Sequence, residues 1–392
     1  MTTILLVDSH DDARRTLATA LGKLRSDWTI AQADSGLAAM SQMDDKSATG
    51  HVDVIITESQ LVDMEGVTLL DQVRSSAQQP LRFTLSSNSE AEAVLANSRA
   101  NQRFLLKPVS AEQLANIIER SMRLQHALNE ERLNLYMSTV NAVPSVPAIY
   151  DEMMKELASA HSSLIKVASI TESDTGLTVT VLKIVNSAFY GLSNRVESVG
   201  QAVTLLGVHL IKNITLTTKV FARFKGSKLS ARRLTQLNDE AMRIGALANQ
   251  FARLAKLSRS TTDHCQIAGM MANVGELIAT SKAESDDGQP SLSIEIIGAR
   301  LLDSWLMPYA VVEAVALQHE SPPRNVDMLS PLVVLHSIRY LQKTFTDTTD
   351  DQQRTLCHEY LAQLVPPAVA EDWMDAFHAI EQLTAAKPPR AA

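Results

Sequence analysis

The chain has 392 residues, of which 45% are hydrophobic and 20% are charged, and its formal net charge is -8. This length accommodates two or more domains with sizeable cores, and the composition is ordinary for a soluble globular protein. The negative charge argues against a protein that coats nucleic acid non-specifically, and no apolar run reaches the roughly 18 residues of a membrane-spanning helix. The start lacks the basic region of a signal peptide. Two cysteines far apart, Cys265 and Cys357, are typical of a reduced, cytoplasmic chain.

Strands and helices alternate through the first 120 residues. We expect strands at 4–7, 28–31, 52–56, 81–85 and 104–106, with helices ending near 24 and at 36–43 and 67–73, and another starting near 110. This alternation predicts a flavodoxin-like, doubly wound parallel sheet. Ligands of such sheets bind outside the carboxyl ends of the strands. Four polar residues fall at those ends, namely Asp8, Glu58, Ser86 and Lys107.

The stretches "ILLVDSHDDARRTL", "DVIITESQLVDMEG" and "FLLKP" resemble the receiver domain of two-component response regulators over residues 1–122. In that family two adjacent acids hold Mg²⁺, an Asp accepts phosphate, and a hydroxyl residue and a Lys contact the phosphoryl group. An aromatic residue on the fifth strand reports phosphorylation. The resemblance carries these roles, in that order, to Asp8 and Ser9, Glu58, Ser86, Lys107 and Phe104. The proline usual four residues after the acceptor is Val62 here.

Two departures from that pattern bear on the chemistry. Ser9 supplies no negative charge to a magnesium site, which is typically held through one or two carboxylates. Glu58 displaces the nucleophilic oxygen by about an ångström relative to Asp, and reactions that depend on positioning suffer from such shifts. We therefore expect a receiver that is not phosphorylated, and is either locked in one state or used only for docking. A structural ion pair between Glu58 and Lys107 is compatible with this, and mimicry of the phosphorylated state by Glu58 is left open.

Residues 110–138 contain no glycine or proline and predict one continuous linker helix. Its apolar face would consist of Leu114, Ile117, Ile118, Met122, Leu128, Leu133 and Leu135. Two alternatives follow for this helix. It pairs with a second copy to form a homodimer, or it packs against the next domain.

Helical periodicity dominates from 139 to 385, before a tail at 386–392, and predicts an all-α domain. The blocks "VPSVPAIYDEMM", "LKIVNSAFYGLSNRVESVGQAVTLLG" and "IAGMMANVGELI" resemble an HDOD domain. That family is related to the HD phosphohydrolases, generally lacks their full ligand set, and is thought to act in signalling or interaction. The motif residues Asn186, Ser187, Phe189, Tyr190 and Gly191 are interpreted as capping and core packing rather than as ligand contacts.

The metal ligands of an HD hydrolase are missing from the expected places. Ala272 and Asn273 occupy the position of the His-Asp pair, and only His319 remains where a terminal ligand would be. One imidazole cannot hold a catalytic metal, since hydrolysis of this kind needs several converging ligands. The Gly-Tyr-Pro signature of cyclic-di-GMP phosphodiesterases is also missing after "HESPP". We therefore expect no cofactor, no metal and no enzymatic activity.

Seven basic residues and no acid lie between Lys212 and Arg233. This stretch meets an acidic protein, a nucleotide or DNA, or is a solvated face with its counter-charges elsewhere. The sequence as a whole predicts a non-enzymatic signalling adaptor that binds a histidine kinase, a cyclic-di-nucleotide enzyme or another regulator. The alternatives are a DNA-binding transcriptional regulator, whose nearest recognition helix is "MRIGALANQFARLAKLSRS", and a metal-dependent HD-type phosphohydrolase.

Overall fold

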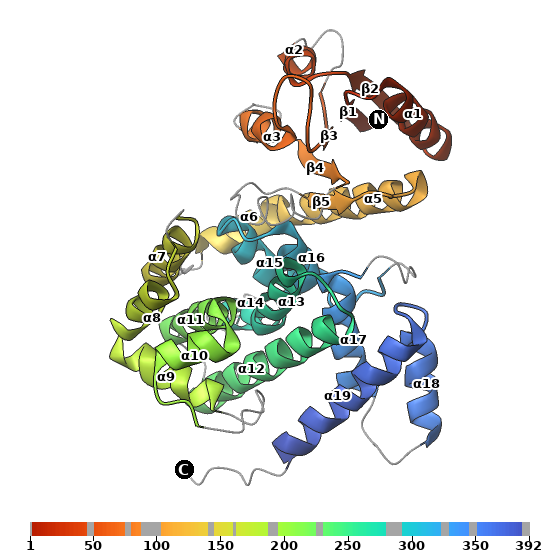
Figure 1. The fold of residues 1–392 in the computed structure, drawn as a ribbon. Coiled ribbons are helices and arrows are strands. Elements are labelled where there is room, and N and C mark those ends of the chain that lie inside the picture. Colours follow the sequence, from red (N-terminus) through yellow and green to blue (C-terminus); the bar gives the residue numbers. More distant parts are fainter. Residues whose placement is uncertain are drawn as a thin grey trace. The chain divides into compact units, whose positions relative to one another are not determined.

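The computed structural model describes residues 2–44, 51–74, 80–87, 103–139, 145–159, 162–186, 195–224, 230–279, 292–322, 329–344 and 351–385. The chain divides into two compact units (Figure 1). The first comprises Met1–Glu130 with Leu306–Tyr309, and the second comprises Glu131–Trp305 with Ala310–Ala392. No helix in the described part of the chain is long and apolar enough to cross a membrane.

The first unit contains a five-stranded parallel sheet in the order β2-β1-β3-β4-β5, as the sequence predicts. The strands are β1 (Thr2–Val7), β2 (Trp28–Ala33), β3 (Val54–Glu58), β4 (Leu81–Ser86) and β5 (Arg103–Leu106). The helices described with them are α1 (Asp11–Leu24), α2 (Gly36–Asp44), α3 (Gly66–Arg74) and α5 (Ala111–Leu128). In register, Val7 lies beside Thr57 and Ser86 beside Leu106, so the residues that follow these strands meet at one edge of the sheet.

The central strands β1 and β3 position that edge because both are buried. Their apolar residues, from Ile4 to Val7 and from Val54 to Ile56, are at most 2% exposed. Near-continuous apolar runs of this kind are expected where helices cover both faces of a parallel sheet. On one side, Leu69 and Leu70 of α3 join Leu5 in a single buried cluster. The polar residues that follow the strands are therefore held at the rim of a packed core.

Gly66 is required where α3 begins, next to Glu58. A Cβ at Gly66 would collide with the carbonyl oxygen of Glu58 and lie 3.1 Å from Cγ2 of Thr57. We expect Gly66→Ala to destabilise the first unit by about 1–3 kcal/mol, because the clash is with backbone. Urea unfolding would measure this. Gly22→Ala is the matched control, since its Cβ has nothing within 4 Å and α1 gains helix propensity. Equal effects of the two substitutions would contradict the prediction.

The expectation of one continuous linker helix is wrong. Helix α5 ends at Leu128, and a separate helix α6 spans Glu131–Thr139. The Asn129 N–H closes α5 on the carbonyl of Gln125, and Glu131 is an acid in the first turn of α6, both of which favour helix ends. Within the first unit, α5 is tied to Arg25 at the end of α1 through Glu119.

The second unit is helical throughout its described residues, as expected. Its helices, after α6, are α7 (Ala148–Leu157), α8 (Leu164–Glu172), α9 (Thr175–Val185), α10 (Val199–Leu206), α11 (Val208–Arg223), α12 (Ala231–Leu254), α13 (Arg259–Met271), α14 (Val274–Ala279), α15 (Ile294–Ser304), α16 (Tyr309–Ala316), α17 (Pro331–Thr344), α18 (Asp351–Leu361) and α19 (Pro367–Ala385). Helices α12 and α13 pack closely, because a Cβ at Gly269 would lie 2.8 Å from the carbonyl oxygen of Ile244. This contact fixes the end of α13, where the chain reaches Ala272 and Asn273.

Candidate functional site

Three charged side chains converge at the carboxyl edge of the sheet in the first unit. Asp8 follows β1, Glu58 ends β3 and Lys107 follows β5. The Lys107 ammonium lies 2.5 Å from Oε2 of Glu58 and 3.5 Å from Oδ2 of Asp8. The side chain of Asp8 is only 9% exposed and that of Glu58 only 13%, so solvent screens this cluster weakly. The prediction that residues at the carboxyl ends of the strands lie together is confirmed for Asp8, Glu58 and Lys107. The expected ion pair between Glu58 and Lys107 is also present.

Ser9 has a structural partner of its own. Its hydroxyl oxygen accepts a hydrogen bond of 3.1 Å from the backbone N–H of Val62, in the loop between β3 and α3. Both residues depart from the receiver pattern, and they bond to each other. Ser9 therefore ties the loop after β1 to the loop after β3. The resemblance would place the second magnesium-binding acid at the position of this serine.

The two carboxyl groups of the cluster have pKa values shifted in opposite directions. Burial raises the pKa of Glu58, the neighbouring Asp8 raises it further, and Lys107 opposes both. Burial also acts to raise the pKa of Asp8, but the backbone N–H of His10, the Glu58 carboxyl group and Lys107 together lower it. When the pair carries one proton, Glu58 is therefore the residue that holds it.

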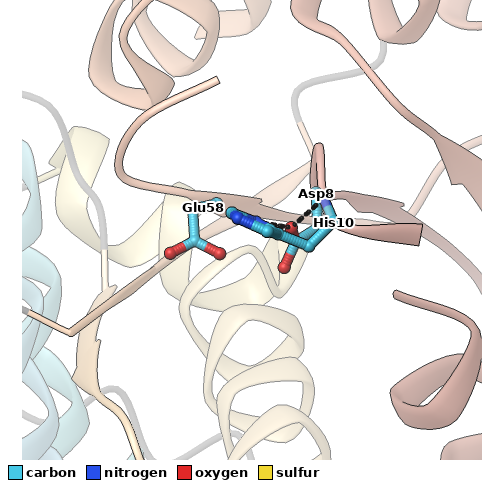
Figure 2. A group of neighbouring side chains, drawn as sticks. All are labelled: Asp8, His10 and Glu58. Carbon is cyan, nitrogen blue, oxygen red and sulfur yellow. Dashed lines mark hydrogen bonds and ion pairs between the residues drawn. The ribbon is translucent and has the colours of Figure 1, made fainter. Parts of the chain in front are cut away.

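His10 is a neighbour that the sequence reasoning missed. Its backbone N–H and its Nδ1 both lie near Oδ1 of Asp8, at 2.8 and 3.2 Å. Figure 2 shows Asp8, His10 and Glu58 gathered on one side of the sheet edge, and one ligand atom from each lies within 4.8 Å of the others. The spacing Asp-x-His after a strand was the available signal. Imidazole does not replace a magnesium ligand, because Mg²⁺ prefers oxygen, so the residues present do not reproduce the magnesium site of the receiver family.

Ser86 and Phe104, the two other predicted receiver residues, are described here by their backbone positions. Ser86 is buried at the end of β4, and its carbonyl oxygen accepts the Lys107 N–H at 2.7 Å. This hydrogen bond holds the backbone of Lys107 against the end of β4. Phe104 lies in β5, beside Thr84, but its side chain is outside the described residues.

In the second unit, the residues at the HD position make protein contacts. Ala272 caps the end of α13, and its carbonyl oxygen accepts the Nε2 of Gln318 at 2.9 Å. The amide of Asn273 donates to Oε2 of Glu240 at 3.0 Å and accepts from Arg339. An alanine and an engaged amide cannot hold the metal of an HD hydrolase, so the residues do not fit that ion. Across the described residues, the group of Asp8, His10 and Glu58 is the only one compact enough for a metal, and it lies in the other unit.

His319 belongs to a different contact. Its Nε2 lies 3.5 Å from Oε1 of Glu295, and its side chain is 59% exposed. Burial lowers its pKa and the nearby Arg339 lowers it further, so the imidazole is neutral at pH 7. Sequence reasoning identified His319 as a candidate site residue but missed Arg339. Arg339 lies 20 positions further on and belongs to no recognised motif.

Asn186, the first residue of the "NSAFYG" motif, bonds to the backbone of Val196. Its Oδ1 accepts the N–H of Val196 and its Nδ2 donates to the carbonyl of the same residue, both at 2.8 Å. The side chain thus satisfies backbone groups locally, which is the role that the sequence suggested for it. Ser187, Phe189, Tyr190 and Gly191 lie outside the described residues.

The basic stretch from Lys212 to Arg233 has much of its charge paired inside the second unit. Lys212 lies 2.7 Å from Oδ2 of Asp263, and both residues are buried. Lys219 pairs with Asp174, and Arg233 forms a two-pronged pair with Glu276, 2.7 Å at each contact. These three counter-charges lie elsewhere in the sequence, as the solvated-face interpretation expects, but Lys212 is buried and is not part of a solvated face. Lys225 and Lys228 lie outside the described residues.

The fold and these two sets of residues are those of a receiver-like unit followed by an HD-related helical unit. Family models match a response regulator receiver domain at residues 4–119 and an HDOD domain at residues 143–288. The chain therefore contains one receiver domain followed by one HDOD domain.

Parts of the chain are similar to proteins of known sequence or structure. Regulatory protein AtoC of Escherichia coli is 27% identical over 179 residues, covering 44% of this chain and 37% of that protein. Sensor kinase CckA of Brucella abortus is 30% identical over 125 residues, covering 31% and 13%. The chain thus spans well under half of these relatives. An HDOD domain protein of unknown function from Geobacter sulfurreducens is similar in structure, with 18% identity, a TM-score of 0.48 and coverage of 67% of this chain and 98% of that one.

Proposed function

We propose that this protein is a non-enzymatic signalling adaptor of the response-regulator kind, in which the receiver is not phosphorylated and the HDOD domain binds a partner protein. The observation that carries the proposal is the ion pair between Glu58 and Lys107. In a phosphorylated receiver, as the resemblance implies, this lysine contacts the phosphoryl group. Here it is already bound to the carboxylate at the acceptor position, 2.5 Å from it.

Three features of the receiver act against phosphoryl transfer. The carboxylate of Glu58 is bound by the Lys107 ammonium, which reduces its nucleophilicity. Ser9 carries no charge and its hydroxyl is bonded to Val62. The residues therefore do not reproduce the metal and nucleophile that in-line transfer needs, and positioning provides most of the catalysis in such reactions.

Restoring the acids tests this part of the proposal. We expect the full chain to incorporate little phosphate from acetyl phosphate and Mg²⁺, and the Ser9→Asp/Glu58→Asp variant to incorporate at least about tenfold more, since correct placement of a nucleophile is worth that much or more. Intact mass spectrometry measures the gain of one phosphoryl group. Ser9→Asp/Glu58→Asn is the matched control, and it should stay unlabelled. Labelling of Glu58 in the wild-type chain would contradict the proposal.

For the HDOD domain, the support is the set of contacts at the HD position. Ala272 offers no ligand, and Asn273 is bonded to Glu240 and Arg339. Hydrolysis would need converging His and carboxylate ligands there. We propose instead a cytoplasmic partner protein, which is a histidine kinase, a cyclic-di-nucleotide enzyme or another regulator.

A further inference from the structure

A charged arginine lies in the second unit at the place where the family relationship would put a metal. We propose that Arg339 is the resident cation of the former HD site, so that this unit holds its arrangement through a guanidinium rather than through a metal ion. The inference deepens the proposed function, since it rests on the HDOD domain not being a hydrolase.

The contacts of Arg339 join three separate parts of the fold. From α17, its Nη2 donates to Oδ1 of Asn273 at the corner between α13 and α14. Its Nε donates to Oε1 of Gln318, just after α16, at 2.7 Å. Its Nη1 donates to Oε1 of Gln342, one turn along its own helix, at 3.0 Å. A planar group with several fixed donors can satisfy acceptors on different helices at once, as a metal ion does with its ligands.

Charges of both signs lie around Arg339: Glu240 and Glu295 attract the guanidinium, and Arg243 repels it. Glu240, from α12, bonds to the amide of Asn273 at 3.0 Å, and Glu295, from α15, lies 3.5 Å from His319. Burial lowers the pKa of Arg339 to about 10, and the attraction of Glu240 and Glu295 opposes this effect. At that pKa the guanidinium is charged at pH 7. Two carboxylates from two helices therefore lie near one half-buried positive charge.

These contacts also leave no place for a divalent ion beside the guanidinium. The oxygens of Asn273 and Gln318 that could serve as ligands accept hydrogen bonds from Arg339. The Nε2 of Gln318, which is fully buried, donates to the carbonyl of Ala272 and secures the same corner. A metal ion would meet a like charge and lone pairs already in use, so its binding requires the removal of Arg339.

Chemical rescue of the full chain tests the role of the guanidinium. We expect Arg339→Ala to lower the melting temperature of the second unit by roughly 3–6 °C, because the buried amide of Gln318 loses a donor and the half-buried Asn273 and Glu295 lose a nearby cation. Millimolar guanidinium should restore about half of that loss or more, whereas urea at the same concentration should not. Arg354→Ala is the matched control, since this arginine pairs with Glu371 and Asp375 at the surface and should show no rescue. An Arg339→Ala variant no less stable than Arg354→Ala, or one that guanidinium fails to rescue, would overturn the inference.

Metal binding gives a second test, which does not depend on whether the Arg339→Ala variant folds. We would titrate Mn²⁺ in an Asp8→Ala background, so that the receiver cannot contribute ligands. With Arg339 present, no binding is expected; with Asn273→Asp and Arg339→Ala combined, Glu240, Glu295 and the new carboxylate should bind one ion. Stoichiometric Mn²⁺ in the second unit with Arg339 present would overturn the inference. Failure of rescue leaves the phosphate labelling of the receiver unaffected, so the two proposals fail separately.

Discussion

Replacing Asp263 with alanine is expected to lower the free energy of unfolding of the second unit by roughly 3–5 kcal/mol. The Asp263 carboxylate accepts from Lys212 and from Asn213, each at 2.7 Å, and all three residues are buried. Without it, the Lys212 ammonium would remain in the core with no counter-charge. Removing one partner of a buried ion pair costs far more than the pair itself contributes, because the remaining charge is not solvated.

Urea unfolding of the helical unit, followed by circular dichroism, measures this loss. Asp375→Ala is the matched control, since Asp375 pairs with Arg354 at the surface and its side chain is 64% exposed. That substitution should change stability by less than about 1 kcal/mol. The double variant Lys212→Met/Asp263→Leu should recover most of the stability, because it removes both charges. Similar losses for Asp263→Ala and Asp375→Ala would show that Lys212 and Asp263 are not a buried pair.

The second large effect is a loss of stability in mild acid that depends on His264. Burial lowers the pKa of His264 from its ordinary 6.5 to about 4, with Lys212 and His209 acting in the same direction and Asp263 against them. Between these two values the unfolded chain binds a proton that the folded chain does not. The stability contributed by neutral His264 is therefore complete above pH 6.5 and is lost as the pH falls toward 4. It amounts to about 3 kcal/mol at most.

Comparing His264→Gln with the wild-type chain isolates this term from the other groups that titrate in the same range. The difference in unfolding free energy between pH 7 and pH 4.5 should be smaller in His264→Gln by about 2–3 kcal/mol. His51→Gln is the control, because the His51 side chain is 63% exposed and lies in the other unit. A wild-type pH dependence that His264→Gln leaves unchanged would contradict the assignment.

The receiver site was predictable because it depends on position along strands. Parallel strands bring their carboxyl ends to one edge, so Asp8, Glu58 and Lys107 meet whatever the detail of the loops. From the sequence, Ser9 is interpreted only as the loss of a negative charge from the magnesium site. Its bond to Val62 spans 53 positions and joins two loops, and no periodicity indicates such a contact.

The helical unit shows where sequence reasoning stops. Helical periodicity predicted an all-α fold, and motif positions identified Asn273, but side-chain networks between helices follow no short spacing. Arg339 reaches Asn273 across 66 positions, and Lys212 reaches Asp263 across 51. The break in the linker helix at Asn129 was missed for another reason, since the sequence there has neither glycine nor proline and the helix end depends on local capping.

Each domain holds a side-chain cation beside its candidate site: the lysine that would contact the phosphoryl group in the receiver, and an arginine at the former HD position in the HDOD domain. Lys107 lies against Glu58 and Asp8 in the receiver, and Arg339 lies against Asn273 and near Glu240 in the HDOD domain. In the proposed reading, Lys107 is occupied by the acceptor-position carboxylate and Arg339 takes the place of a metal ion. This arrangement suits a protein that signals by binding rather than by catalysis.

The most direct test is affinity capture from an extract of the native cells with the full chain, performed with and without acetyl phosphate, together with metal analysis of the purified protein. We expect the same signalling proteins to be recovered in equal amounts under both conditions, and no stoichiometric divalent metal to accompany the chain. Capture that changes on addition of the phosphodonor, or a stoichiometric metal with no partner protein, would contradict this expectation.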